Sequence, residues 1–412
     1  MNRSGSYPKT PDRQQATQGG HEASILPFRP ASPTPRVWLL IGDKLGDNQQ
    51  VELIANRLTE RLNWRVDVRR LQFKDAFRTG KPQFRVDHGH VDWAGSDAIM
   101  PPWPDLVLTV GRRPSMVALW IKEQSRGQTR IVIVGRPRRW LKRFNLIIAA
   151  AHHHVPPLPN VLRLGLPLIR ADAVSLAAAR ARWTSRFANL PRPLVALFVG
   201  GPTKPHVFDR GVASDLMARA AECVAQSGGT LWVTTSPRTS RDVIDALEEA
   251  LPENGRLFRW RPNDPDNPYL GLLACADRFI VTGDSVSMQV EVARLGKPLA
   301  IHPLPVRYGF VERLRRLTAR IAYGKASGVG ALVPRLIRSL QKIGVMQFPR
   351  DVAEIHTLLF EQGFAVRLGE PFANPGAGVD VDLDQIVDRI RALMSHEGTS
   401  TARTPHAFVP EF

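Results

Sequence analysis

Short apolar runs alternate along this chain with longer segments whose apolar residues recur at helical spacing. The strands that this alternation predicts lie at 37–41, 65–71, 105–110, 130–134, 144–150, 194–199, 231–235, 257–260 and 279–281. Strands that alternate with helices of this length are typical of parallel sheets with right-handed crossovers. The sequence therefore predicts an α/β protein with two Rossmann-like, doubly wound domains in tandem.

Changes in composition along the chain suggest where these domains begin and end. The first 35 residues are rich in Pro, Ser, Thr, Gln and Gly with little apolar spacing, which is typical of a disordered tail. A proline-containing stretch before Leu194 indicates a junction. We predict a disordered tail at 1–35, an N-terminal Rossmann-like domain at 36–190, a C-terminal Rossmann-like domain at 191–345, a C-terminal segment with a closing helix at 346–395 and a second tail at 396–412.

Hydropathy and cysteine content narrow the setting of the protein. The sequence contains no window of the 18 or so apolar residues that a membrane-spanning helix needs, and its N-terminus lacks the profile of a secretory signal. Its two cysteines, Cys223 and Cys275, each lie in a run with helical spacing, so we expect neither a disulfide framework nor a thiolate metal site. We expect a cytoplasmic protein.

The charge balance is strongly basic. The chain has 56 Lys and Arg against 38 Asp and Glu, a formal charge of +18. Such a surface favours anionic partners such as phosphates, acidic lipids or nucleic acid. An arginine excess that reflects a GC-rich genome accounts for the balance equally well.

Polar loops follow three of the strands expected in the second domain. Because ligands of open α/β sheets lie beyond the carboxyl ends of the strands, these loops together predict a diphosphate site. Paired glycines let the backbone approach a ligand, hydroxyls donate to phosphate oxygens, and a guanidinium matches a diphosphate. The candidate ligand-binding residues in these loops are Gly200, Gly201, Thr203, Ser236, Arg238, Thr239, Asp284, Ser285 and Ser287.

Each of these loops also has a purely structural interpretation. The two glycines can form a turn, Thr239 or Ser240 can cap the next helix, and Asp284 or Ser285 can be an N-cap. Glu291, two turns into the helix, is a candidate to hold ribose hydroxyls, and a surface carboxylate that pairs with Arg294 is the alternative.

The first domain offers candidates for acid–base chemistry. Its first loop has glycines at 42 and 46 without the third glycine of a dinucleotide-binding fingerprint, and its polar residues suit a catalytic carboxylate, Asp47, or a contact with an acceptor. Ordinary turn chemistry explains the loop nearly as well. Arg112 and Arg113 follow another strand and form either an anion site for an acidic acceptor or lipid headgroup, or a solvated basic rim.

Three adjacent histidines, His152 to His154, cannot all face one ion, and no other Cys/His cluster accompanies them. We therefore expect no metal site and no cofactor, and we expect a single histidine, His152, to act as a proton acceptor.

The segment Arg313 to Lys342 carries eight basic and no acidic residues, interleaved with Leu, Ile and Val. A basic amphipathic segment of this kind can bind an anionic membrane surface, which would make the protein membrane-peripheral. A buried helix face with basic flanks is the alternative. Specific nucleic-acid binding is not expected, since aromatic residues are not interleaved with the basic ones.

Taken in order, several of these loops resemble those of the ELM-type mitochondrial fission family, which has many bacterial members of unknown activity. The resemblance covers roughly residues 36 to 395 and is most specific at Asp-Ser-Val-Ser-Met, residues 284–288. Its other matching stretches lie at 42–49, 110–113, 135–138, 160–161, 198–202, 235–239, 296–298 and 358–363, with the helix at 383–394.

That family in turn is similar to GT-B glycosyltransferases, whose two Rossmann-like domains face each other across a cleft. The resemblance implies that the second domain binds a nucleoside-diphosphate sugar without an obligatory metal. The helix behind Asp284 and Ser285 would face the donor diphosphate, and Asp47 or His152 would be the base. The sugar would pass to an unknown acceptor.

Two departures from the family pattern affect this expectation. His152-His153 stands where the family tends to have a His-Asp pair before the Asn-Val, and the segment 313–342 looks like an insertion. The resemblance also implies a non-catalytic alternative, because the plant namesake helps to recruit fission machinery to mitochondria. A third class is nucleotide-sugar epimerase, but this sequence lacks the Tyr-x-x-x-Lys pair that is expected of that chemistry.

Overall fold

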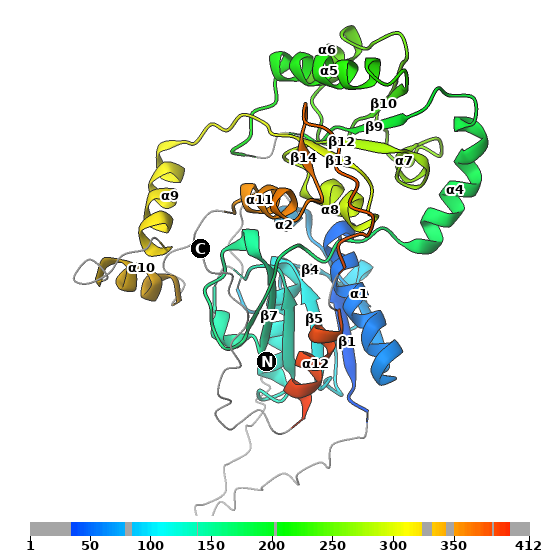
Figure 1. The fold of residues 1–412 in the computed structure, drawn as a ribbon. Helices are drawn as coiled ribbons and strands as arrows, with labels where there is room; N and C mark the ends of the chain where they lie inside the picture. Colours follow the sequence, from blue (N-terminus) through cyan, green and yellow to red (C-terminus); the bar gives the residue numbers. More distant parts are fainter. Residues whose placement is uncertain are drawn as a thin grey trace, which may run out of the picture. The chain divides into compact units, whose positions relative to one another are not determined.

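The computed structural model describes residues 34–78, 85–137, 139–201, 204–323, 332–342, 350–380 and 383–395. The predicted disordered tail at 1–35 and the tail at 396–412 lie almost entirely outside these ranges, as does Thr203. Most of the described chain forms two parallel sheets with helices on their faces (Figure 1).

The first sheet has the strand order β2-β1-β5-β6-β7-β8, and all its described strand pairs are parallel. Its strands are β1 (Val37–Ile41), β2 (Val66–Arg70), β5 (Leu106–Val110), β6 (Arg130–Val134), β7 (Leu146–Ala150) and β8 (Val161–Leu164). The helices α1 (Leu45–Leu62) and α3 (Arg112–Gln124) follow β1 and β5.

Shorter elements complete this half of the chain. They are β3 (Gln72–Phe73), α2 (Asp75–Arg78), β4 (Val91–Asp92) and the 3₁₀ turns η1 (Trp93–Gly95), η2 (Leu141–Arg143) and η3 (Ala151–His153). β3 and β4 pair in an antiparallel arrangement.

The second sheet repeats the pattern, with the order β11-β10-β9-β12-β13-β14 and parallel pairing in its described strands. Its strands are β9 (Leu194–Phe198), β10 (Thr230–Thr234), β11 (Gly255–Phe258), β12 (Arg278–Thr282), β13 (Leu299–His302) and β14 (Val366–Arg367). Its helices are α5 (Arg210–Ala225), α6 (Arg241–Glu249), α7 (Tyr269–Cys275) and α8 (Val286–Arg294).

The central strands of both sheets, such as β1, β5, β9 and β12, are buried on their two faces, which explains why they read as continuous apolar runs. The edge strands β2 and β8 are partly exposed. Successive residues of β1 alternate between two apolar clusters, with Val37, Leu39 and Ile41 on one face and Trp38 and Leu40 on the other. The same alternation divides β9 between two further clusters. This arrangement confirms the predicted fold class, an α/β protein with two Rossmann-like parallel sheets.

In each sheet the chain first extends the strand order to one side and then returns to the centre to extend it to the other. In the first sheet the reversal lies between β1 and β5, and in the second it lies between β9 and β12. The loops after these strands separate at the reversal, which is where open α/β sheets bind their ligands. The fold therefore marks two positions, one on each sheet, for a site.

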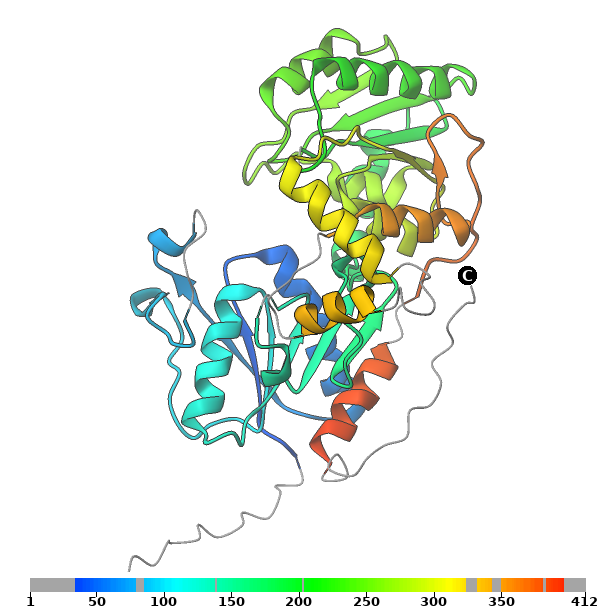
Figure 2. The same ribbon diagram turned by 90° about the vertical axis from the view of Figure 1, so that its left-hand side faces the viewer.

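Helices far apart in the sequence cover parts of both halves. α4 (Ala173–Phe187) packs against α7, and its Trp183 and Phe187 belong to a core cluster of the second sheet. α12 (Leu383–Met394) returns to the first sheet and packs along α1, as Figures 1 and 2 show. Arg57 of α1 forms an ion pair with Asp384 of α12 at 2.7 Å.

The predicted basic segment contains most of α9 (Phe310–Tyr323) and all of α10 (Leu332–Lys342), and the two helices pack against each other. Residues 324–331 lie outside the described part. Both helices precede α11 (Ala353–Glu361). Arg316 of α9 forms an ion pair with Asp351 at 3.2 Å, just before α11.

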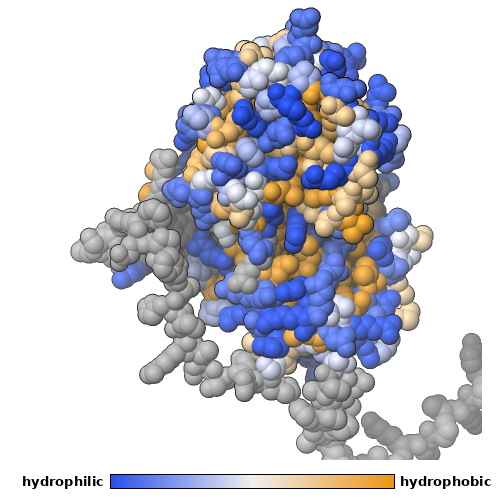
Figure 3. Space-filling model, turned by 45° about the vertical axis from the view of Figure 1, so that its right-hand side comes forward, coloured by the Kyte–Doolittle hydropathy of each residue, from blue (hydrophilic) through white to orange (hydrophobic). Residues whose placement is uncertain are grey.

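The described helices include none that is long and apolar enough to cross a membrane. Hydrophilic and apolar side chains are interspersed over the face shown in Figure 3. Composition alone therefore singles out no partner surface on that face.

Candidate functional site

The loops after β9 and β12 are joined by buried hydrogen bonds at the centre of the second sheet. The carboxylate of Asp284 accepts the backbone N–H of Gly201 at 3.0 Å and the hydroxyl of Thr282 at 2.8 Å. The Thr282 hydroxyl oxygen in turn accepts the N–H of Gly200 at 2.9 Å. Asp284 thus faces inward and fixes the shape of both loops.

Burial raises the pKa of Asp284, and the hydrogen bond from Thr282 and the positive charge of Arg238 oppose that rise. The Arg238 guanidinium lies 3.8 Å from the carboxylate, while 53% of the Arg238 side chain stays exposed. Arg238 is therefore positioned by a buried carboxylate and still reachable by a ligand.

Two glycines are required here by close approach. A Cβ on Gly200 would lie 2.2 Å from the hydroxyl oxygen of Ser285, and a Cβ on Gly201 would lie 2.1 Å from the backbone oxygen of Arg238. Distances this short exclude any side chain without movement of the loops. Both paired glycines are needed for the contact between the three loops.

The loop after β10 closes on the same place. Thr239 donates its hydroxyl to the backbone oxygen of Gly200 at 2.6 Å and accepts the N–H of Ser236 at 2.9 Å. Ser236 accepts the N–H of Arg238 at 3.3 Å. Of the predicted ligand-binding residues, Ser236 and Thr239 therefore hold the loop that carries Arg238.

Ser285 is the N-cap residue of α8, but its side chain does not cap the helix. The residue is only 3% exposed, and its hydroxyl oxygen has no hydrogen-bond partner among the described residues. The first amides of a helix also lack partners within the helix and attract anions. Ser287, two residues further along the chain, is exposed.

Glu291 lies deeper than the sequence suggested. Its carboxylate accepts the hydroxyl of Tyr269, the first residue of α7, and burial raises the pKa of both groups. Arg294 donates to the backbone oxygen of Pro167 at 2.8 Å, so the alternative of a surface Glu291–Arg294 pair is not what the structure shows. Ribose binding by Glu291 stays a prediction.

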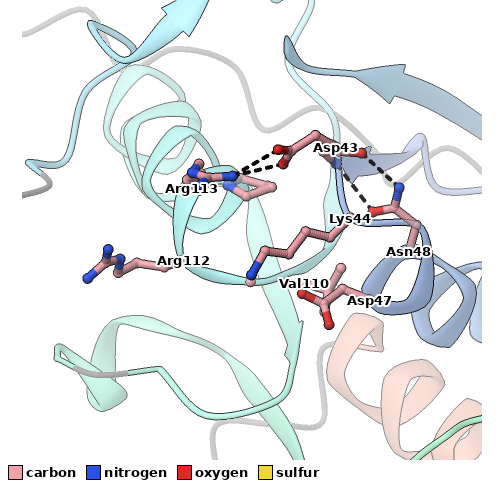
Figure 4. Close-up of a pocket in the computed structure, with 10 residues that line it drawn as sticks. Asp43, Lys44, Asp47, Asn48, Val110, Arg112 and Arg113 are labelled. Carbon is pink, nitrogen blue, oxygen red and sulfur yellow. Dashed lines mark hydrogen bonds and ion pairs between the residues drawn. The ribbon is translucent and has the colours of Figure 1, made fainter. Parts of the chain in front are cut away.

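The first sheet has a pocket of about 90 Å³ at its own reversal point (Figure 4). It lies between the loop after β1 and the start of α3, and Asp47 lines it together with Lys44 and Arg112. The predicted catalytic residue Asp47 and the predicted anion-site residue Arg112 are therefore brought together, as the topology of the sheet requires.

His152 lies elsewhere, in the η3 turn after β7. It is 1% exposed, and neither ring nitrogen has a partner among the described residues. Burial and the neighbouring His153 and Arg350 lower the pKa of His152 to about 2. A neutral imidazole of such low basicity is a poor proton acceptor at neutral pH.

Arg350 is not among the site residues predicted from the sequence. Part of the surface of Arg350 is exposed to solvent. The protein atoms that surround the rest of the residue lower the pKa of its guanidinium. The charge of Asp47 raises this pKa, and the charge of Arg238 lowers it. The guanidinium of Arg350 therefore lies within electrostatic range of a carboxylate of the first sheet and an arginine of the second. Its neighbour Asp351 donates a backbone N–H to the oxygen of His152 at 3.0 Å.

The described residues contain no group of three or more His, Cys, Asp or Glu side chains arranged to hold a metal ion.

Two parallel, doubly wound sheets, each with polar loops at its reversal point, define an α/β protein built from two Rossmann-like domains. The chain belongs to the mitochondrial fission ELM1 family, whose model matches residues 46–324.

The curated relatives include the mitochondrial fission protein ELM1 of Arabidopsis thaliana, which is 28% identical over 220 residues, covering 48% of this chain and 51% of that protein. The match thus spans about half the length of this relative. An uncharacterized protein of Rickettsia prowazekii is 21% identical over 300 residues, covering 64% of this chain and 82% of that protein.

Solved structures with a similar arrangement include the UDP-GlcNAc 2-epimerase of Neisseria meningitidis, with a TM-score of 0.41 and 12% identity over 79% of this chain and 98% of that one. A glycosyltransferase of Rickettsia africae has a TM-score of 0.40 and 9% identity over 80% of this chain and 98% of that one. We assign the fold from the strand order and pairing described above.

Proposed function

We propose that the second sheet binds the diphosphate of a nucleoside-diphosphate sugar and that the protein transfers the sugar to an acceptor at the first sheet. The observation that carries this proposal is the buried hydroxyl of Ser285, which has no partner among the described residues and lies at the N-terminus of α8. A buried polar group without a partner is costly unless a ligand or water satisfies it.

The surrounding groups suit a diphosphate. Arg238 offers a guanidinium fork beside the loop glycines, and the N-terminus of α8 offers partial positive charge. Asp284 is a positioning residue in this account, because both of its oxygens are engaged within the loops. Ser285 and Ser287 would donate to phosphate oxygens, while Gly200 and Gly201 let the backbone come close.

In the proposed reaction, a hydroxyl oxygen of the acceptor forms a bond to the anomeric carbon of the sugar. The bond from that carbon to the diphosphate oxygen breaks, and the nucleoside diphosphate leaves with the electron pair. Asp47 takes the proton of the hydroxyl. Arg238 and the helix N-terminus stabilise the negative charge that develops on the leaving group.

Asp47 suits the role of base better than His152 does. The Asp47 carboxylate lines an open pocket, whereas His152 is buried and its pKa is lowered to about 2. His152 then contributes to the packing of η3 near Arg350.

The test is the release of nucleoside diphosphate from a panel of sugar nucleotides, measured for the parent protein and for Arg238→Gln and Asp47→Asn. Arg180→Gln, which removes an exposed charge from α4, is the matched control. Release that both site variants abolish and the control retains would support transfer. Binding of the sugar nucleotide without release, even with extracts of candidate acceptors, would favour a protein that senses the nucleotide without turnover.

A second candidate function, docking on an anionic membrane surface, is favoured by the exposed apolar face of α9. Phe310, Leu314 and Leu317 are 81%, 52% and 54% exposed, and basic residues such as Arg313 and Arg315 lie between them. Exposed apolar residues among arginines are typical of interfacial helices. We propose that α9 and α10 attach the protein peripherally to acidic lipid, in a cytoplasmic setting, as an adaptor or as an enzyme.

A further inference from the structure

The pocket at the first sheet lies at the point where its strand order reverses, between the loop after β1 and the loop after β5 (Figure 4). Open α/β sheets bind their ligands at such points. Its volume of about 90 Å³ exceeds what a single water molecule needs. The pocket is therefore large enough for one small polar group of a ligand.

The walls of this pocket are fixed by contacts that leave its interior open. Asp43 of the first loop holds Arg113 of α3 at 2.9 Å, which ties the two loops together. Asn48 donates to the backbone oxygen of Gly42 at 2.8 Å and accepts the Gly42 N–H at 3.3 Å. Because these groups bind one another, the pocket is preformed.

The lining also holds two charged side chains that form no ion pair with any residue that the structure describes. Lys44 and Asp47 both line the pocket, and Figure 4 shows the ammonium group and the carboxylate on the same side of the loop, beside Val110. Among the described residues neither side chain has a hydrogen bond or ion pair. The ammonium of Lys44 suits an anionic group of a ligand, and the carboxylate of Asp47 suits a proton donor of the same ligand.

We propose that this pocket recognises an anionic acceptor, with a phosphate or carboxylate group held by Lys44 and the reacting hydroxyl presented to Asp47. This inference rests on the proposed function for the identity of the ligand as the acceptor. These two residues would select acceptors that carry both an anionic group and a hydroxyl. A neutral alcohol would leave the ammonium of Lys44 unpaired. An anion without a hydroxyl would leave Asp47 without a proton to accept.

The experiment uses inorganic phosphate as the probe and the thermal midpoint as the readout, at constant ionic strength with chloride as the reference anion. All variants carry Arg238→Gln, which removes the proposed phosphate ligand of the second sheet. Lys44→Gln is compared with Lys142→Gln, which removes an exposed lysine of the same half of the chain. Asp47→Asn is the third variant.

We expect phosphate to stabilise the Arg238→Gln protein and the Lys142→Gln control alike. Lys44→Gln should weaken phosphate binding at least tenfold, because a hydrogen bond to a charged group is lost. Asp47→Asn should strengthen phosphate binding, because it removes a negative charge from the lining. Opposite effects of two neighbouring substitutions would not arise from general damage to the loop.

The inference is overturned if phosphate stabilises Lys44→Gln as much as its control, or if it stabilises none of the Arg238→Gln proteins. In either case a response of the parent protein to nucleoside diphosphates would leave the proposed function standing. Conversely, a phosphate effect that depends on Lys44, without any response to nucleoside diphosphates, would support the anion pocket and count against the sugar-nucleotide site.

Discussion

The carboxylate of Asp284 accepts the backbone N–H of Gly201 at 3.0 Å, and this contact joins two loops that are 83 residues apart in the sequence. The two loops lie on either side of the point where the strand order of the second sheet reverses. Asp284, which the sequence predicts as a ligand contact, therefore holds the backbone of the site in the structure. Arg238, Ser285 and the N-terminus of α8 remain as the groups proposed to contact the ligand.

Replacing Asp284 with alanine should lower the free energy of unfolding by about 3 kcal/mol, because the Gly201 amide and the Thr282 hydroxyl both lose a buried partner. Urea unfolding monitored by circular dichroism measures the change. Asp209→Ala removes an exposed N-cap carboxylate of α5 and should cost only about 1 kcal/mol. Equal losses for the two variants would contradict the structural role of Asp284.

Adding a methyl group at Gly201 should displace the loop that carries Arg238, since the new Cβ would lie 2.1 Å from the Arg238 backbone oxygen. We expect Gly201→Ala to unfold at a lower temperature and to lose any response to nucleoside diphosphates. Gly46→Ala is the matched control, because a Cβ there meets nothing within 4 Å and the residue lies in a helix. That control should be neutral or slightly stabilising. Normal nucleotide binding by Gly201→Ala would show that the two loops need not touch.

His152 predicts a dependence of stability on pH. The unfolded chain protonates this residue below about pH 6.5, whereas the folded chain does so only near pH 2, so falling pH favours unfolding over that interval. His152→Phe removes the proton site, and both ring nitrogens lack partners among the described residues, so little is lost. At pH 5 the variant should be more stable than the parent by about 2 kcal/mol relative to the difference at pH 7.5. Parallel stability curves between pH 7.5 and 5 would show that His152 is protonated in the folded protein.

The exposed face of α9 predicts binding to vesicles that contain acidic lipid. Leu314→Ser combined with Leu317→Ser should lower the partition coefficient roughly a hundredfold, since each leucine contributes about 1.5 kcal/mol of burial in the lipid interface. Added salt should weaken binding by screening the arginines. Val174→Ser, at an exposed position of α4, is the control. If the vesicles sediment and the parent protein stays in the supernatant, the membrane surface is ruled out as a partner.

The parallel sheets could be predicted because their signal is local. Each buried strand reads as an apolar run, and the stretch from 194 to 199 gave β9 within one residue. β8, which lies in the proline-containing stretch before Leu194, and β14, which has only two residues, depend on pairing with neighbours. The docking of α12 on α1 depends on contacts more than 300 residues apart, which no periodicity reveals.

The sequence could predict which loops form the candidate site but not how the side chains of these loops are oriented. Strand order places loops at one edge, so the grouping of Gly201, Arg238 and Asp284 followed from the sequence. The inward turn of Asp284 did not, because it depends on the backbone amide of a distant loop. Arg350 follows a stretch without clear periodicity, and Lys44 resembles any loop lysine until the pocket around it is known.

The sugar-nucleotide site on the second sheet is tested by the thermal midpoint of the purified protein against a panel of nucleoside diphosphates and their sugars. A ligand at a hundred times its dissociation constant should add about 2.7 kcal/mol of stability. We predict such a stabilisation with one nucleoside diphosphate, lost in Arg238→Gln and retained in Arg180→Gln. No stabilisation by any member of the panel, from folded protein, would contradict a sugar-nucleotide site on the second sheet.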